Sequence, residues 1–132
     1  QLIRHTLVDL GLHETLTYTL TSEATVNEFN LFHSLDNTVK LMSPLGEERS
    51  AARKSLIGSL LQTIHYNNAH SNKDVNIFEI ANTYSDKEVS NLAIAVSGDY
   101  VNVPWMGKKE AVDFYLVKGF VETLFKKLFL KN

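Results

Sequence analysis

The sequence contains no cysteine, only two prolines and no long apolar run among its 132 residues. The absence of cysteine excludes disulfides, thiolate metal sites and cysteine-based catalysis. A membrane-spanning helix needs about 18 consecutive apolar residues, and no stretch of the sequence approaches that length. No signal-peptide pattern opens the chain. The formal net charge is −2, so the sequence lacks the basic excess of a general nucleic-acid-binding domain.

Motifs that carry catalytic or metal chemistry are missing as well. The five histidines include no pair at ligand spacing on one helix face, so no metal site is predicted. There is no glycine-rich phosphate loop and no nucleophile elbow. The apolar fraction of 44% is ordinary for a folded domain, and the length predicts a single domain over residues 1–132. The chain begins in mid-pattern at Gln1 and stops just after a helix, as expected of a fragment.

Apolar periodicity predicts an α+β fold, with a mostly antiparallel sheet flanked by helices. The expected helices cover about residues 1–10, 22–30, 56–66 and 114–130. The expected strands cover about residues 12–20, 38–42, 75–84 and 92–97, with a turn at 31–37 and a loop at 100–111. The expected helix caps are Thr21 or Ser22, then Ser50 or Ser55, and finally Asp113.

One charged residue falls on an apolar face of the predicted strand at 75–84. Alternation places Glu79 on the same face as Val75 and Ile77. A buried carboxylate needs a partner, because an unpaired charge in an apolar interior is costly. We hypothesise that Arg53, rather than Arg49, supplies that partner. A structural ion pair is the preferred interpretation over a catalytic one.

The packing of two residues near the end of the chain can be predicted. Trp105 could be a lid, an interface anchor or a cover for the core, and we favour the cover. Gly119 interrupts a helix that is apolar on most of its circumference, at a cost of about 1 kcal/mol relative to alanine. Close packing of Gly119 against a neighbouring backbone would explain why a glycine occurs inside this helix. A helix so widely apolar is expected to be buried in something larger or to meet a partner.

The stretch around Pro44 carries a resemblance to a known family. It resembles the "NPLSEERSxLRxSLLPGLL" block of the bacterial phenylalanyl-tRNA synthetase beta subunit, with differences at Ser43, Ala52 and Gly58. The matching residues are Pro44-Leu45, Glu47-Glu48-Arg49-Ser50, Arg53, Ser55-Leu56 and Leu60-Leu61. Residues 112–122 resemble the family's "VDFFDLKGDVExLL". The resemblance implies a fragment of the subunit's core domain, similar to the core of class II aminoacyl-tRNA synthetases.

The beginning of the chain resembles a subunit-interface element of that family. Residues 7–14 are similar to "LxxLGFxEVxxYSL", which corresponds to the helix and strand of motif 1 in class II synthetases. The resemblance therefore implies a role for this helix and strand in subunit association. The candidate interface residues are Ile3, Leu7, Leu10, Leu16 and Tyr18.

The end of the strand at 75–84 carries the most informative difference. It resembles the family's "LFEIGRVF", and the matching strand of catalytic class II synthetases reads "IGxVFRxE", whose arginine holds the ATP α-phosphate. That pattern places Ser85 at the arginine position. A hydroxyl cannot supply the bidentate, permanently charged contact of a guanidinium. The resemblance therefore implies no catalytic, cofactor-binding or metal-binding residue in this chain.

The function implied is that of a non-catalytic core domain in phenylalanine–tRNA ligase. Such a beta subunit pairs with the catalytic alpha subunit in a cytoplasmic α2β2 enzyme that charges tRNA(Phe) with phenylalanine. The whole enzyme uses ATP and Mg²⁺, and no membrane partner is expected. Two alternatives remain open: an active class II-type ATP-binding domain, and a stand-alone protein-interaction module.

Overall fold

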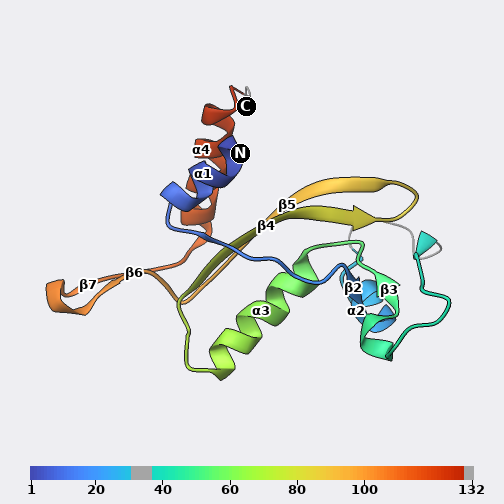
Figure 1. Cartoon of the computed structure of the whole chain (residues 1–132). Helices are drawn as coiled ribbons and strands as arrows, with labels where there is room; N and C mark the ends of the chain where they lie inside the picture. The colour runs from blue at the N-terminus through green and yellow to red at the C-terminus, as the bar shows by residue number, and fades with distance from the viewer. Residues whose placement is uncertain (31–36, 130–132) are drawn as a thin grey trace. The chain divides into compact units, whose positions relative to one another are not determined.

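A computed structural model describes residues 1–30 and 37–129 of the chain (Figure 1). It divides into two compact units. Unit 1 comprises Gln1–Thr15, Ile64–Phe78 and Ile94–Asn132, and unit 2 comprises Leu16–Thr63 and Glu79–Ala93. The expectation of a single domain over residues 1–132 remains a prediction. The turn expected at 31–37 lies outside the described residues except for Asn37.

The elements confirm the predicted α+β class. The helices are α1 (Leu2–Asp9), α2 (Glu23–Glu28), α3 (Ile57–Ala69) and α4 (Phe114–Lys127), with short 3₁₀ helices at Glu47–Arg49 and Pro104–Met106. The strands are β1 (His13–Glu14), β2 (Leu20–Thr21), β3 (Ala51–Ala52), β4 (Val75–Tyr84), β5 (Glu88–Ser97), β6 (Asp99–Val103) and β7 (Lys108–Ala111). No helix among residues 1–30 and 37–129 combines the length and apolarity needed to cross a membrane.

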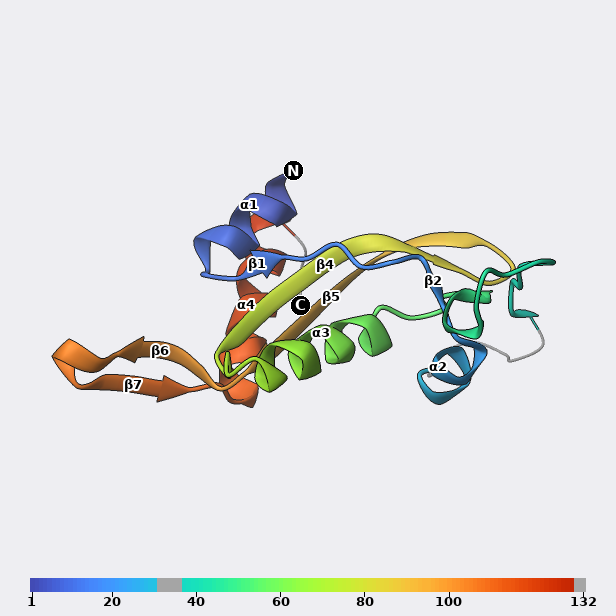
Figure 2. The same ribbon diagram turned by 60° about the horizontal axis from the view of Figure 1, so that its bottom comes forward.

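The strands form one larger sheet and two small ones. The larger sheet has the order β1–β4–β5, and β1 runs parallel to β4. The residues 85–87 that join β4 to β5 are too few for a crossover, so these two long strands form an antiparallel hairpin (Figure 2). The pairs β2–β3 and β6–β7 are both antiparallel.

Unit 1 is built on the contact of α1 with α4. The Tyr100 hydroxyl donates a hydrogen bond to the Leu10 carbonyl at 2.7 Å, and its ring meets Phe120 edge to face at 5.6 Å. Gly11 ends α1 at a φ of 85°, which favours glycine, as the sequence predicts. The core of this unit consists of Leu7, Leu12, Val75, Ile77, Phe78, Phe120 and Leu124.

The helices α2 and α3 each begin with one of the two side-chain caps that the sequence offers. The Ser22 hydroxyl accepts a hydrogen bond from the Thr25 amide at 3.1 Å at the start of α2. The Ser55 hydroxyl accepts one from the Ile57 amide at 3.2 Å at the start of α3. Among the described residues, the apolar core of this unit includes Val26, Ala51, Ala52, Leu56 and Leu60.

Several predicted elements differ from the structure. The strand expected at 12–20 is reduced to β1 and β2, because the Thr17 amide between them donates to the Glu79 side chain rather than to a strand carbonyl. In the strand expected at 38–42, only Lys40 forms a bridge, to Ala51. The predicted loop at 100–111 is wrong, since β6 and β7 pair there as a hairpin. Of the helix expected at 114–130, α4 covers Phe114–Lys127, and Leu130 lies outside the described residues.

The packing predictions for Trp105 and Gly119 are also wrong. Trp105 is 84% exposed, because it sits on the turn of the β6–β7 hairpin and covers no core. A Cβ added at Gly119 would meet no described atom within 4 Å, so no backbone packs closely against that glycine in the part of the chain described. The Asp113 carboxylate does cap α4, accepting the Leu116 amide at 2.8 Å.

Candidate functional site

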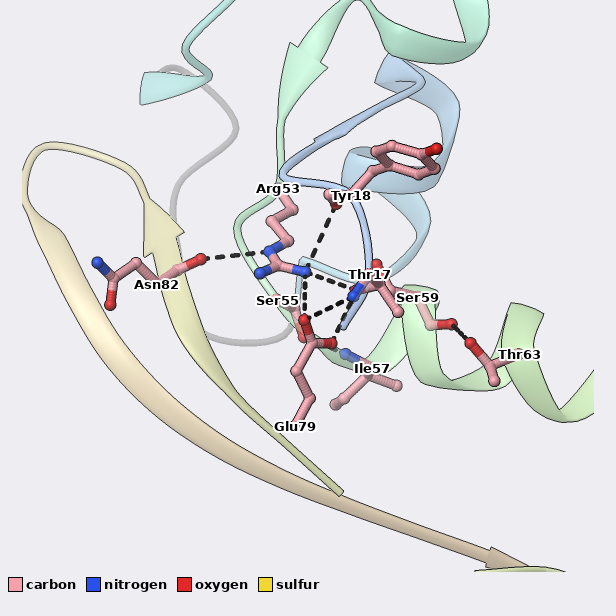
Figure 3. Close-up of polar contacts among 9 residues, drawn as sticks. All are labelled: Thr17, Tyr18, Arg53, Ser55, Ile57, Ser59, Thr63, Glu79 and Asn82. Atoms are coloured by element: carbon pink, nitrogen blue, oxygen red, sulfur yellow. Dashed lines mark hydrogen bonds and ion pairs between the residues drawn. The ribbon is translucent and has the colours of Figure 1, made fainter. Parts of the chain in front are cut away.

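Arg53 and Glu79 meet inside unit 2, as the sequence hypothesis proposes (Figure 3). Arg53 follows β3 directly, and Glu79 lies in the middle of β4. The Arg53 Nη1 atom is 3.1 Å from Glu79 Oε1, and the two side chains are 4% and 1% exposed. At such burial, both charges depend on protein groups rather than on water for stabilisation.

Thr17 supplies the additional hydrogen bonds that a buried pair requires. Its amide and hydroxyl donate to Glu79 Oε1 and Oε2 at 3.0 and 2.7 Å. The same hydroxyl accepts a hydrogen bond from Arg53 Nη1 at 2.7 Å. Arg53 Nε donates to the Asn82 carbonyl at 3.2 Å. The pair therefore holds the irregular segment around Thr17 against β4 (Figure 3).

The backbone of Arg53 adds a second set of links in the same place. Its amide donates to the Thr19 carbonyl at 3.0 Å, and its carbonyl accepts from the Tyr84 amide at 2.9 Å. Through its side chain and its backbone, Arg53 thus connects the end of β3, the segment 17–19 and β4 in unit 2. This arrangement offers stability, and it leaves the two charged groups shielded from a solution-borne substrate.

Ser85 lies in the turn between β4 and β5. Its amide donates to the Lys87 carbonyl at 3.3 Å, and its side chain is half-buried. A short neutral hydroxyl does not fit the clamp that an ATP phosphate needs. Among the described residues, no group of three or more histidine, aspartate or glutamate side chains could hold a metal ion. The correspondence of Ser85 with the family's arginine remains a prediction.

The predicted interface residues have very different exposures. Leu7 is buried in the core of unit 1, while Ile3 and Leu10 are half-buried there. In unit 2, Leu16 and Tyr18 are 83% and 68% exposed. The last two therefore offer the accessible apolar surface that an interface needs.

A cation accompanies this exposed aromatic surface. The Arg49 guanidinium lies 3.6 Å from the centre of the Tyr18 ring, in a cation–π contact. Sequence reasoning considered Arg49 as a partner for Glu79 and did not predict this contact. The contact orients the Tyr18 ring although no core surrounds it.

Sequence reasoning also missed the anchor of the β6–β7 hairpin. Asp74 precedes β4, and its Oδ1 and Oδ2 atoms accept hydrogen bonds from the Asp99 amide at 2.9 Å and the Asn102 side chain at 3.0 Å. The Asp99 amide above all, then Asn102 and the charge of Lys109, lower the pKa of Asp74 below its ordinary value. The sequence does not reveal this anchor, because Asp99 and Asn102 lie 25 and 28 residues after Asp74.

Comparisons of the whole sequence reveal a family. Residues 1–132 match the family described as phenylalanyl tRNA synthetase beta chain CLM domain. The phenylalanine–tRNA ligase beta subunit of Staphylococcus epidermidis is 37% identical over 136 residues, covering 98% of this chain and 17% of that protein. The corresponding protein of Staphylococcus aureus is 36% identical over 138 residues, covering 99% of this chain and 17% of its own length. The chain thus spans about one sixth of these curated relatives.

Solved structures agree at the level of the fold. A pyrrolysyl-tRNA synthetase from Desulfitobacterium hafniense superposes with a TM-score of 0.71 at 13% identity, covering 99% of this chain and 44% of that one. A second structure of the pyrrolysyl-tRNA synthetase from this organism gives a TM-score of 0.69 at 13% identity, with 98% and 47% covered. This likeness confirms the predicted synthetase-like core, and at such identity it concerns the fold alone.

Proposed function

Since the chain belongs to the family of phenylalanyl-tRNA synthetase beta chain CLM domains, we propose that it is an architectural core domain of a phenylalanine–tRNA ligase beta subunit. The main support for this proposal is that the family match extends over residues 1–132. In the complete enzyme, the domain would support association with the alpha subunit and the charging of tRNA(Phe) with phenylalanine. ATP and Mg²⁺ would act on the alpha side, in the cytoplasm, and the domain itself would bind neither.

The residues of the site support an architectural role. Arg53 and Glu79 are buried and bonded to the protein, so they would hold the shape of unit 2 rather than act on a substrate. The neutral side chain of Ser85 supports the same view, since it cannot replace a phosphate-binding guanidinium. The domain would therefore contribute surface and rigidity to an enzyme whose chemistry lies in another subunit.

We propose that Leu16 and Tyr18 contribute to the surface that meets the alpha subunit. Both are large, apolar and exposed, which is typical of residues that become buried on association. Ile3 and Leu10 in α1 would add a smaller contribution because they are already half-buried. Leu7 would support α1 from within, because its side chain has no exposed surface.

Copurification tests the proposed function. A complete beta subunit that contains this sequence, coexpressed with the alpha subunit of the same ligase, should purify as a heterotetramer that aminoacylates tRNA(Phe). Each subunit expressed alone should be inactive. A complete beta subunit that never associates with alpha would favour the stand-alone interaction module instead.

The interface residues have a matched control. Tyr18→Glu in the complete beta subunit should weaken copurification with alpha at least about tenfold, because it places a charge in an apolar interface. Val89→Glu, at an exposed apolar residue of β5, introduces the same charge and should leave copurification intact. Equal losses from both changes would show that the effect of Tyr18→Glu is not specific to that surface.

The second candidate function is an active ATP-binding domain, which the synthetase-like fold favours. Isothermal titration of the chain with ATP and Mg²⁺ would separate the two candidates. We expect no saturable binding. Binding that is lost in Ser85→Ala would overturn the architectural assignment, because it would place the nucleotide beside that hydroxyl.

A further inference from the structure

The turn of the β6–β7 hairpin displays an aromatic ring away from any core. Trp105 is 84% exposed and Met106 is 50% exposed, on a 3₁₀ turn that begins at Pro104. Figures 1 and 2 show this turn at the end of a two-stranded arm, which β6 and β7 form (residues 99–111). No other described element of unit 1 lies beside the turn. A Cβ added at Gly107 would likewise meet no described atom within 4 Å. Within the part of unit 1 that the structure describes, nothing covers the ring.

The arm is held in shape although its end is open. The Gly107 amide donates to the Pro104 carbonyl at 3.1 Å and closes the turn, with Gly107 at a φ of 63°. At the base, Asp74 accepts the hydrogen bonds from Asp99 and Asn102 described above. Because the arm is held at both ends, little conformational entropy would be lost when Trp105 binds a partner.

The charge beside the ring is positive. Lys108 and Lys109 directly follow the turn, whereas the acidic residues of the arm, Asp99 and Glu110, lie farther from Trp105 along the chain. Lys109 Nζ is 3.2 Å from Asp99 Oδ2, which offsets part of its charge. Of the ion pairs found among the described residues, none involves Lys108. Lys108 is thus the cation nearest to Trp105 in the sequence, and its charge is not offset by a described ion pair.

We propose that this arm binds an unpaired nucleotide of single-stranded RNA. Trp105 would stack on the exposed base, and Lys108, assisted by Lys109, would contact the adjacent phosphates. An aromatic face with neighbouring cations is the combination by which proteins bind single-stranded nucleic acid without reading its sequence. A duplex offers no free base face, so double-stranded RNA would bind through its phosphates alone. The proposal goes beyond the architectural role and does not depend on the alpha subunit.

The fluorescence of the chain tests the proposal directly, because Trp105 is its only tryptophan. We expect an oligouridylate of about 12 nucleotides to quench the emission saturably at low salt, and a duplex of the same length to quench it much less. Since Lys108 and Lys109 contact at most two phosphates, the logarithm of affinity should fall with the logarithm of salt with a slope of about −0.7 to −1.4.

Variants identify the residues that bind RNA, and the fluorescence anisotropy of a labelled oligouridylate measures the affinity of each variant. Trp105→Leu should weaken binding about 5- to 150-fold, the range expected for loss of one stacked base. Lys108→Glu should also weaken it, whereas Lys87→Glu, the same charge change in the β4–β5 turn, should have an effect below about twofold. Circular dichroism would check that each variant is folded.

Several outcomes would overturn the proposal. One is that oligouridylate does not bind the chain, and another is that it binds without changing the emission of Trp105. Equal quenching by single-stranded and duplex RNA would exclude base stacking. Equal affinities of the Trp105→Leu variant and the parent chain would exclude the arm as the binding site. A partner protein that shifts the emission while RNA has no effect would show that the arm binds protein instead.

Discussion

Replacing Arg53 with methionine should destabilise the chain far more than breaking a shorter ion pair on its surface. The Arg53–Glu79 pair has an N–O distance of 3.1 Å and is almost fully buried. The Lys40–Glu23 pair is closer, at 2.6 Å, but its side chains are 55% and 46% exposed. If distance decided the strength, the surface pair would be the more important one.

Burial reverses that order. With an effective dielectric constant of about 20, Coulomb's law gives about 5 kcal/mol for the buried pair, against about 1.6 kcal/mol for the surface pair in water. Arg53→Met also leaves the Glu79 carboxylate buried without its cation, so the loss in unfolding free energy should be about 3–5 kcal/mol. Lys40→Met should cost less than about 1 kcal/mol, since water screens the charge that remains.

Urea titration followed by far-ultraviolet circular dichroism measures both losses in the 132-residue chain. A third variant isolates the effect of the Glu79 charge that is left without its cation. Glu79→Gln in the Arg53→Met background removes the charge while the amide oxygen can still accept the bond from the Thr17 amide, so the double variant should be more stable than Arg53→Met alone. Losses for Arg53→Met and Lys40→Met that agree within about 0.5 kcal/mol would refute the reasoning, as would a double variant with no recovery.

Other substitutions probe the turns and α4. Asp74→Asn should make stability depend less on pH at the acid end of the profile. The lowered pKa of Asp74 stabilises the fold above pH 3.8, and this contribution disappears at lower pH. Acid profiles that are the same for the variant and the parent chain would count against this role of Asp74. Gly98→Ala should cost about 2–3 kcal/mol in a urea titration, because φ is 78° and the new Cβ would clash with the Lys73 carbonyl. Gly107→Ala, also at positive φ but in open space, should cost only about 1 kcal/mol, and equal losses would contradict the clash. Gly119→Ala should raise the melting temperature by removing about 0.5–1 kcal/mol of helix penalty, and a decrease would mean that the site is crowded.

Features that depend on local pattern were predictable from the sequence. The bounds of β4, Val75–Tyr84, are those predicted, because alternation continues over ten residues between polar segments. The cap Asp113 was identified, and Ser22 was one of two candidates, because short polar side chains before an apolar run favour a helix start. The partner of Glu79 followed from the same kind of argument, since a carboxylate on an apolar strand face needs a cation.

Features that depend on distant contacts were not predictable in this way. The strand β7 is Lys-Lys-Glu-Ala, which has no apolar alternation, and it is a strand only because β6 pairs with it. Trp105 was expected to cover the core, and its exposure follows from that unpredicted hairpin. Thr17 escaped notice because its role depends on the path of an irregular segment, which periodicity cannot reveal.

The triangle of Arg53, Glu79 and Thr17 also bears on how this domain can diverge. A single exchange at either charged position leaves an orphaned charge in a dry interior, so natural selection should rarely accept one without the other. Across related sequences, positions 53 and 79 should therefore change together, either keeping opposite charges or losing both to apolar residues. If positions 53 and 79 instead varied independently, as freely as the exposed Val89, the fold would tolerate an unpaired buried charge at this site.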